Sequence, residues 1–383
     1  MKRRINRFLL TVTAFLGIWF AYIGHQLIGL TALDWLTKSY CWLVLAMPFC
    51  LLLWLPAFHW QDDSPARSRV RDAAVWSSYV SMGLLSFLLV FVVLRDFSWL
   101  VLRDARLYGS AASLATMGVA FLLLVVGMLA ARRSPKVTTV DIPIKDLPGA
   151  FDGYRIVQLS DMHISTHIQR NFVRDVVATV NGLRPDAIAL TGDIFDGDVS
   201  ELGPHLAQLE KLSARDGRFF VTGNHEYYWG VDQWVAEMRR LGFTTLVNSH
   251  ALVHRSDQSI IIAGVADFWA SRNASGGISD PLAAIANSPK EVTTRILLAH
   301  QPSSATAAAP LGFALQLSGH THGGQFFPWT LFAYAFHKFA RGLHRLDEMW
   351  IYVNRGTGSW GPPVRLGSRS EITVVRLVRS KRD

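Results

Sequence analysis

Four long runs without a charged residue lie in the first third of this 383-residue chain, at 8–33, 40–61, 73–94 and 107–131. The hydrocarbon core of a bilayer is spanned by a helix of about 20 apolar residues, so each run is long enough to cross it. The basic start resembles a signal peptide, but the first apolar run is too long for one. We therefore expect a membrane domain over residues 1–136, with four transmembrane helices at about 8–30, 40–58, 73–94 and 110–131.

Charge is divided unevenly between this third and the rest of the chain. Residues 1–136 carry 14 Lys and Arg against 6 Asp and Glu, which gives +8 of the total net charge of +9. Residues 137–383 are therefore nearly neutral. A nucleic-acid site needs a basic face on a folded domain. We expect no nucleic-acid partner, because the basic excess belongs to the membrane domain.

Basic residues near the ends of the runs predict the orientation of the membrane domain. With the N-terminus inside, ten Lys and Arg lie on the inner side: Lys2, Arg3, Arg4, Arg7, Arg67, Arg69, Arg71, Arg132, Arg133 and Lys136. Four lie on the outer side: Lys38, Arg95, Arg103 and Arg106. Cytoplasmic segments are enriched in Lys and Arg. This bias places residues 137–383 in the cytoplasm.

The second part of the chain alternates strand-like and helix-like segments. The predicted strands are short runs rich in Val, Ile and Leu at 155–159, 187–190, 219–221, 259–263, 296–299, 314–317, 350–353 and 372–377. The predicted helices lie at 169–183, 204–212, 231–241 and 281–286. Continuous apolar strands are typical of sheets covered on both faces. Residues 137–383 are therefore predicted to form one α/β domain.

Polar clusters directly follow five of the predicted strands. They begin at Ser160, Thr191, Thr222, His300 and Ser318. Sites in α/β proteins gather at the carboxyl ends of strands, so these clusters are expected to meet. Each cluster contains Asp, His or Asn, whose oxygen and imidazole donors suit divalent metals such as Mn, Fe or Zn. The sequence therefore predicts a metal site built from five loops.

In this order the clusters resemble the signature of the calcineurin-like metallophosphoesterases: D-x-H, G-D-x-x-D, G-N-H-[D/E], a lone H and G-H-x-H. The match covers about 140–377. The run Gly-His-Thr-His-Gly-Gly-Gln and the tail at 354–365 are similar to a branch of membrane-attached phosphodiesterases, which includes the YkuE-like bacterial enzymes and the transmembrane proteins with a metallophosphoesterase domain. The resemblance implies a four-layer αββα sandwich over 137–383, preceded by an all-α bundle of four transmembrane helices.

The resemblance also implies two divalent metal ions and a role for each motif residue. Asp161, His163 and His322 would bind the first metal, Asn224, His300 and His320 the second, and Asp193 would bridge them. A hydroxide bridging the metals would attack phosphorus. His225 would protonate the leaving group as general acid, and Glu226 could orient its imidazole. Asp196 is expected to support the metal shell rather than bind a metal.

The expected activity is hydrolysis of a phosphodiester or pyrophosphate bond at a bacterial inner membrane. Membrane attachment suggests a lipid or lipid-linked substrate, such as a phospholipid or a UDP-diacylglucosamine type of molecule. Two alternatives stay open: a general phosphomonoesterase, and a non-catalytic membrane sensor or scaffold. Metal identity and oligomeric state are left undetermined by the sequence, and specificity is expected in cap loops such as 266–280.

An aromatic and basic segment at 328–341 follows the last metal motif. It has the length of a helix. Such a segment either packs on its own domain or lies in the bilayer interface, where it would admit a lipid substrate to the metal site. Its position beside His322 motivates the second hypothesis, and both stay open.

Overall fold

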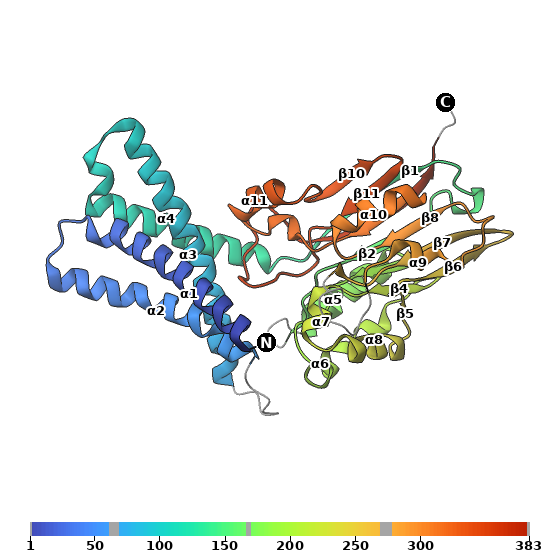
Figure 1. The fold of residues 1–383 in the computed structure, drawn as a ribbon, viewed down its shortest axis with the longest axis horizontal. Helices are drawn as coiled ribbons and strands as arrows, with labels where there is room; N and C mark the ends of the chain where they lie inside the picture. Colours follow the sequence, from blue (N-terminus) through green and yellow to red (C-terminus); the bar gives the residue numbers. More distant parts are fainter. Residues whose placement is uncertain (1, 61–68, 166–169, 269–277, 381–383) are drawn as a thin grey trace. The chain divides into compact units, whose positions relative to one another are not determined.

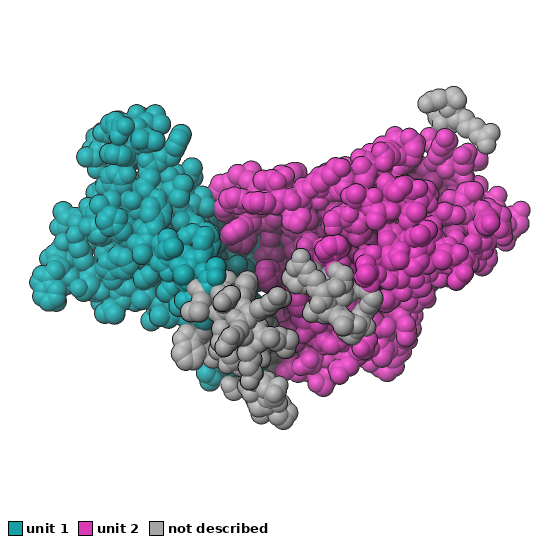
Figure 2. All heavy atoms as spheres, viewed as in Figure 1, with its two compact units in different colours: residues 1–130, 361–366 teal, residues 131–360, 367–383 magenta. Residues whose placement is uncertain are grey.

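The computed structural model describes residues 2–60, 69–165, 170–268 and 278–380. It divides the chain into two compact units, residues 1–130 with 361–366 and residues 131–360 with 367–383 (Figure 2). The short segment 361–366 belongs to the first unit because it packs on helix α4 (Ser110–Ala131), where the Arg365 N–H donates to the Gly127 carbonyl at 2.9 Å. The chain therefore leaves the second unit and returns to it within six residues.

The first unit is helical. Its elements are α1 (Lys2–Gly24), the π-helical turn η1 (His25–Gly29), α2 (Trp35–Trp60), α3 (Arg69–Leu102), the short η2 (Ala105–Tyr108) and α4. Three helices in the described part of the chain are long and apolar enough to cross a membrane, over Trp35–Leu53, Val70–Leu102 and Ser110–Ala131. The first predicted span, at 8–30, is divided between α1 and η1 and is not among these three.

Arg95 lies inside α3 rather than in an outer loop, because this helix continues beyond the predicted end at Leu94. Its side chain is only 7% exposed. The guanidinium donates to the Gln26 carbonyl at 2.8 Å and to Gln26 Oε1 at 3.0 Å. A charge among apolar helices has to find polar partners in this way. Arg95 therefore does not count as an outer-loop residue.

The second unit contains two six-stranded mixed sheets (Figure 1). The first has the order β1 (Lys136–Ile144), β12 (Glu371–Arg379), β2 (Arg155–Leu159), β3 (Ala187–Thr191), β4 (Arg218–Val221), β5 (Thr244–Thr245). The second has the order β10 (Gly342–Leu346), β11 (Met349–Val353), β9 (Leu315–Ser318), β8 (Arg295–Leu298), β7 (Gln258–Gly264), β6 (Ser249–Arg255). The strands β2, β3 and β4 are parallel to one another, as are β7, β8, β9 and β11.

Three hydrophobic cores hold these layers together. One lies between the sheets and includes Ile156, Ile262 and Leu317. The second packs α5 (Arg170–Gly182), α6 (Val199–Leu206) and α8 (Val231–Arg240) on the outer face of the first sheet. The third packs α9 (Pro281–Ile285) and α10 (Ala305–Ala308) on the outer face of the second sheet. The unit is thus an α/β sandwich with helices outside both sheets.

All eight predicted strands are present, and each ends within two residues of its expected end. The structure adds four strands that were not predicted, β1, β5, β6 and β10, which lie at the four edges of the two sheets. The helix predicted from Pro204 begins earlier, at Val199. The predicted cap loop at 266–280 falls largely on residues 269–277, outside the described residues.

Candidate metal centre

The loops that follow β2, β3 and β4 in the first sheet and β8 and β9 in the second bring the predicted ligands together. Parallel strands present their carboxyl ends at one edge of a sheet, so ligands that are far apart in sequence become neighbours there. Six of the seven predicted ligands fall into groups whose ligand atoms lie within 4.8 Å of one another. The seventh, Asn224, directly precedes His225, which belongs to one of these groups.

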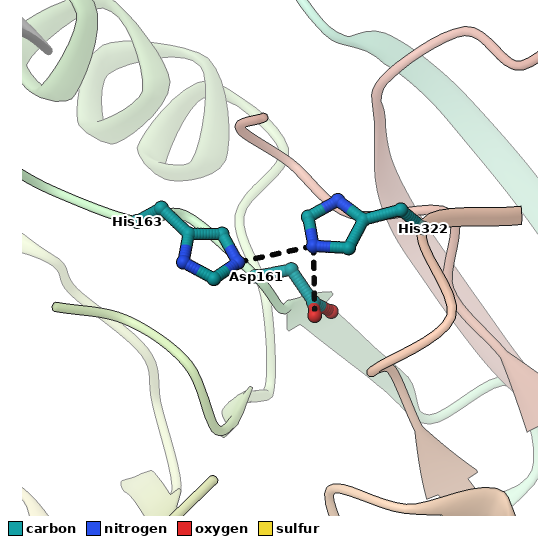
Figure 3. A group of neighbouring side chains, drawn as sticks. All are labelled: Asp161, His163 and His322. Atoms are coloured by element: carbon teal, nitrogen blue, oxygen red, sulfur yellow. Dashed lines mark hydrogen bonds and ion pairs between the residues drawn. The ribbon is translucent and has the colours of Figure 1, made fainter. Parts of the chain in front are cut away.

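Asp161, His163 and His322 form the first group (Figure 3). The Nε2 atoms of the two histidines face each other at 3.0 Å, and His322 Nε2 lies 3.4 Å from Asp161 Oδ1. Two imidazole nitrogens and a carboxylate oxygen directed at one point form a donor set for a divalent cation. A cation there would also relieve the repulsion between the facing ring nitrogens.

Asp193, His300 and His320 form the second group. His300 Nε2 lies 3.2 Å from Asp193 Oδ2 and 3.2 Å from His320 Nδ1. The other ring nitrogen of His300 is 2.8 Å from the Thr191 carbonyl, to which it donates, so the tautomer leaves Nε2 available to the centre. Burial and the neighbouring His300 lower the pKa of His320 to about 3. His320 is thus neutral, the state in which imidazole binds metals.

Asp193 links the two groups, because it belongs to the second and also forms a group with His163 of the first and with His225. Asn224 is 6% exposed, and no described residue hydrogen-bonds its buried Oδ1. A buried acceptor without a partner is costly unless something binds it. The shared carboxylate and this vacant acceptor fit a pair of divalent cations. The His and Asp clusters are therefore suited to a dinuclear metal site.

The backbone of the ligand loops is strained. Positive φ angles occur at Asp161 (50°), His163 (48°), Asp193 (52°), His320 (72°) and His322 (51°). Such angles are uncommon outside glycine and cluster at functional sites, where this backbone conformation orients the side chains. Two glycines allow the close approach: a Cβ at Gly223 would collide with Asp193, and one at Gly319 with Ser160 and Asp161.

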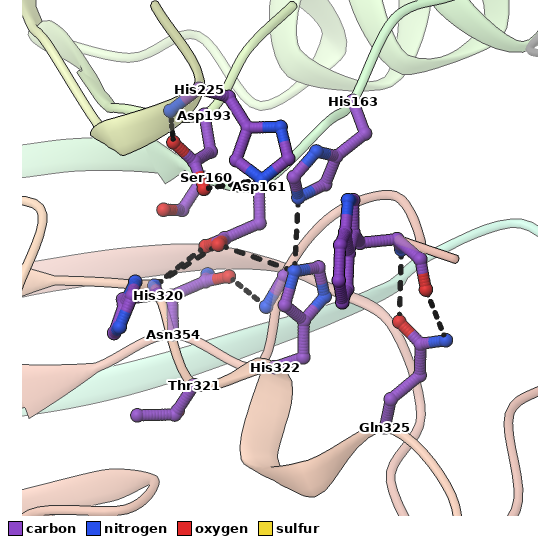
Figure 4. A network of polar contacts seen from close by, with 12 residues as sticks. Ser160, Asp161, His163, Asp193, His225, His320, Thr321, His322, Gln325 and Asn354 are labelled. Carbon is purple, nitrogen blue, oxygen red and sulfur yellow. Dashed lines mark hydrogen bonds and ion pairs between the residues drawn. The ribbon is translucent and has the colours of Figure 1, made fainter. Parts of the chain in front are cut away.

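His225 is held beside this centre by two aspartates, of which Figure 4 labels Asp193. Its backbone N–H donates to Asp193 Oδ1 at 2.8 Å, and its Nδ1–H donates to Asp196 Oδ1. Its Nε2 lies 3.8 Å from Asp193 Oδ2. Burial lowers the pKa of His225, but the charges of Asp196 and Asp193 outweigh it and raise the pKa to about 9. The ring is thus oriented by one carboxylate and presents Nε2 toward the other.

Glu226 does not orient His225, contrary to expectation. Its carboxylate accepts backbone N–H groups of Gly223 at 2.6 Å, Asp193 at 3.0 Å and Ile194 at 2.8 Å. Glu226 is the third residue of the short helix α7 (Asn224–Tyr228). From this position its side chain reaches back to the backbone N–H groups that precede the helix. It therefore holds the Asp193 loop in place, and Asp196 takes the orienting role.

Asp196 contacts two histidines at once. Besides His225 it contacts His163, whose Nδ1 lies 3.1 Å from Asp196 Oδ2. Burial raises the pKa of Asp196, but His225 and His163 together hold it well below its usual range. The expected support of the metal shell is visible in the His163 contact, and the His225 contact was not anticipated.

Two aromatic residues outside the motifs also contact His225. The ring centroid of Tyr228 lies 5.2 Å from that of His225, and the ring centroid of Trp360 lies 5.7 Å from it. Tyr228 follows three residues after His225 on α7, which places both on one helix face. Trp360 is distant in sequence, and no motif signals it.

Comparison with known proteins agrees with this site. Residues 154–324 match the family model of the calcineurin-like phosphoesterases. A transmembrane protein with metallophosphoesterase domain from Danio rerio is 35% identical over 88% of this chain and 80% of its own length. The protein of the same name from Bos taurus is 40% identical over 69% of this chain and 62% of its own length.

A bacterial relative extends the comparison. The metallophosphoesterase YkuE of Bacillus subtilis (strain 168) is 33% identical over 60% of this chain and 81% of its own length. The matched family, the clustered ligands and the sandwich fold all agree. The chain is a phosphoester hydrolase and belongs to the calcineurin-like metallophosphoesterases, with relatives among the transmembrane proteins with a metallophosphoesterase domain and the YkuE-like enzymes.

Proposed function

We propose that this protein hydrolyses a phosphodiester or pyrophosphate bond at two divalent cations of the Mn, Fe or Zn type. One cation is held by Asp161, His163 and His322, the other by Asn224, His300 and His320, and Asp193 lies between them. The observation that carries the proposal is that two groups of three residues, Asp161 with His163 and His322 and Asp193 with His300 and His320, each have their ligand atoms within 4.8 Å, and that Asp193 also groups with His163.

The surrounding residues supply the proton chemistry. Two bound cations would supply a Lewis acid for the phosphoryl oxygens and lower the pKa of a bound water molecule. As the water oxygen bonds to phosphorus, the bond to the leaving oxygen breaks, and that oxygen takes a proton from His225 Nε2. Asp196 keeps Nδ1 occupied, so Nε2 is the nitrogen that faces the reaction. Glu226 keeps Asp193 in place.

We further propose a lipid or lipid-linked substrate. Three helices are apolar enough to cross a membrane, so the site belongs to a protein that resides at a bilayer. Helix α11 (Trp329–Phe336), seven residues beyond His322, exposes Phe332 (46%) and Phe336 (79%). Exposed apolar residues of this size on one helix are suited to the interface of a membrane. This face would bring the domain to its substrate.

The arrangement in the membrane follows from the basic residues. We propose that α1 is a fourth span and that both termini lie in the cytoplasm, at a bacterial inner membrane. Lys2, Arg3 and Arg4 precede α1's apolar part, and Arg132 and Arg133 follow α4. An even number of spans places both clusters on one side, as the positive-inside rule requires.

Turnover and metal content together test the proposed chemistry. Detergent-solubilised protein with Mn²⁺ is expected to cleave a bis-aryl phosphate, and His225→Ala to lower kcat about 100-fold or more, because the leaving group loses its proton donor. The variant should keep its two metals, measured by elemental analysis. His254→Ala is the matched control, since this exposed histidine bonds Ser259 on β7. Bound metal without turnover in the unaltered protein would refute the proposal and favour a scaffold.

A further inference from the structure

Two exposed aromatic rings flank the side chain of His225. Trp360 is 43% exposed, and its indole meets the imidazole edge to face, with an angle of 79° between the rings. The Tyr228 residue is 48% exposed and its ring is tilted by 59° against the same imidazole. His225 itself is only 8% exposed, so these two exposed rings are the aromatic surface beside a buried histidine.

The side chain of Gln325 fixes the backbone of Trp360. Its amide donates to the Trp360 carbonyl at 2.9 Å and accepts the Trp360 N–H at 3.0 Å (Figure 4 shows Gln325 with both bonds). Gln325 is 7% exposed, has a φ of 46°, and directly follows the loop that carries His320 and His322. Residues in strained backbone conformations cluster at functional sites, so the fixed position of Trp360 is a candidate functional feature.

The segment before Trp360 is hydrogen-bonded to the residues that directly follow β2. The Thr357 N–H donates to the Ser160 carbonyl at 2.7 Å, and the Gly358 N–H donates to the Asp161 carbonyl at 3.0 Å. Gly358 is packed so closely on Met162 that a Cβ there would collide with its carbonyl. The position of Trp360 relative to the ligand Asp161 is therefore set by the backbone.

We propose that Trp360 and Tyr228 form the leaving-group subsite and that it takes an apolar or aromatic leaving group. The inference rests on the proposed role of His225. The proton from Nε2 goes to the leaving oxygen, so the carbon group attached to that oxygen must lie beside the imidazole. The indole and phenol rings are what it meets there, and aromatic rings bind apolar and planar groups. Gln325 acts through Trp360 as a positioning residue.

A pair of diesters that differ only in the leaving group tests this subsite. The full-length detergent-solubilised protein with Mn²⁺ is assayed on methyl naphthyl phosphate and on methyl trifluoroethyl phosphate. Trp360→Ala is expected to lower kcat/KM about tenfold for the naphthyl ester and less than about twofold for the trifluoroethyl ester. Each substrate is compared with itself, so the different intrinsic reactivities cancel. Trp360→Phe should restore most of the naphthyl activity.

Two further variants separate positioning from folding. Gln325→Ala should reproduce the selective loss on the naphthyl ester, a pattern that a damaged metal site would not produce. Trp350→Ala is the matched control, because Trp350 lies near the start of β11 and its indole N–H donates to the Pro143 carbonyl. It should leave the ratio of the two activities unchanged.

The outcomes distinguish the two proposals. Equal losses on both esters in Trp360→Ala, with the unaltered protein active, would overturn the subsite and leave the proposed function standing. An unaltered protein that cleaves neither ester would overturn the proposed function and the subsite with it. A selective loss on the naphthyl ester supports both.

Discussion

Asp196 shows how one carboxylate can serve two parts of a site. It faces His163, a proposed metal ligand, and His225, the proposed proton donor. Its side chain is 13% exposed, so both contacts are largely shielded from water and keep their strength. The two histidines are thereby coupled: any change at Asp196 alters the orientation of a ligand and of the proton donor together.

Replacing Asp196 with Asn is expected to lower kcat about 10- to 100-fold with little change in KM. The two imidazoles bond different oxygens of Asp196, so in Asn an NH2 group would face one of the two imidazole N–H groups, which would lose its acceptor. Steady-state kinetics at saturating Mn²⁺ measures the effect, and a metal titration measures the loss of affinity. Asp198→Asn, at an exposed carboxylate two residues away, is the control. Unchanged kcat in Asp196→Asn would exclude the orienting role.

At the scale of elements, whether a strand could be predicted depends on its position in the sheet. The eight predicted strands include every interior strand, while the four unpredicted ones are the edges. Interior strands are covered on both faces and read as continuous apolar runs, as in β3, where all five residues are buried. Edge strand β10 alternates half-buried and exposed residues and begins with glycine, so a search for apolar runs misses it.

Helix α11 shows which part of segment 328–341 packs on its own domain and which part is exposed. The helix ends at Phe336, and the residues after it turn inward, with Phe339 6% exposed and packed in the third core. The basic end of the segment therefore does not continue the helix. Along the helix itself Trp329, Phe332 and Phe336 form a row of contacting rings. The segment thus packs on its own domain at its end and exposes aromatic rings along its helix.

Replacing Trp329, Phe332 and Phe336 together with Ser is expected to lower activity on a phospholipid in vesicles about tenfold or more, because the apolar area available to the interface is lost. Activity on a soluble bis-aryl phosphate should be retained. Leu282→Ser on α9, another exposed apolar residue (60%), is the control. Equal losses on the lipid and the soluble substrate would show that α11 only stabilises its own domain.

At the scale of the whole molecule, the two units differ in composition as well as in fold. The first 136 residues carry +8 of the net charge of +9, and the sandwich carries the histidines that gather around Asp193. Most basic residues of the first unit lie near the ends of its apolar stretches, and the orientation that we propose in the membrane rests on them. The chemistry of the second unit depends on its own side chains.

Reporter fusions at the two ends test the orientation. With both termini in the cytoplasm, a reporter after Asp383 that is active only in the cytoplasm should give signal, and a reporter active only outside should give none. The same pair of reporters before Met1 should behave identically if α1 is a span. A signal from the outside reporter at Asp383 alone would show an odd number of spans and would contradict the proposed cytoplasmic domain.

The sequence by itself determined the family, the interior strands and the residues that gather at the metal centre, because these depend on local patterns: apolar runs, and ligands placed directly after strands. Only the tertiary structure decided which carboxylate orients His225, since Glu226 is its neighbour in the motif whereas Asp196 comes from another motif, and the choice depends on side-chain direction. Likewise, only the fold brings Trp360 to His225, across 135 residues, and separates 361–366 from its neighbours. Contacts between distant segments depend on how the sheets and loops pack, and no local pattern encodes them.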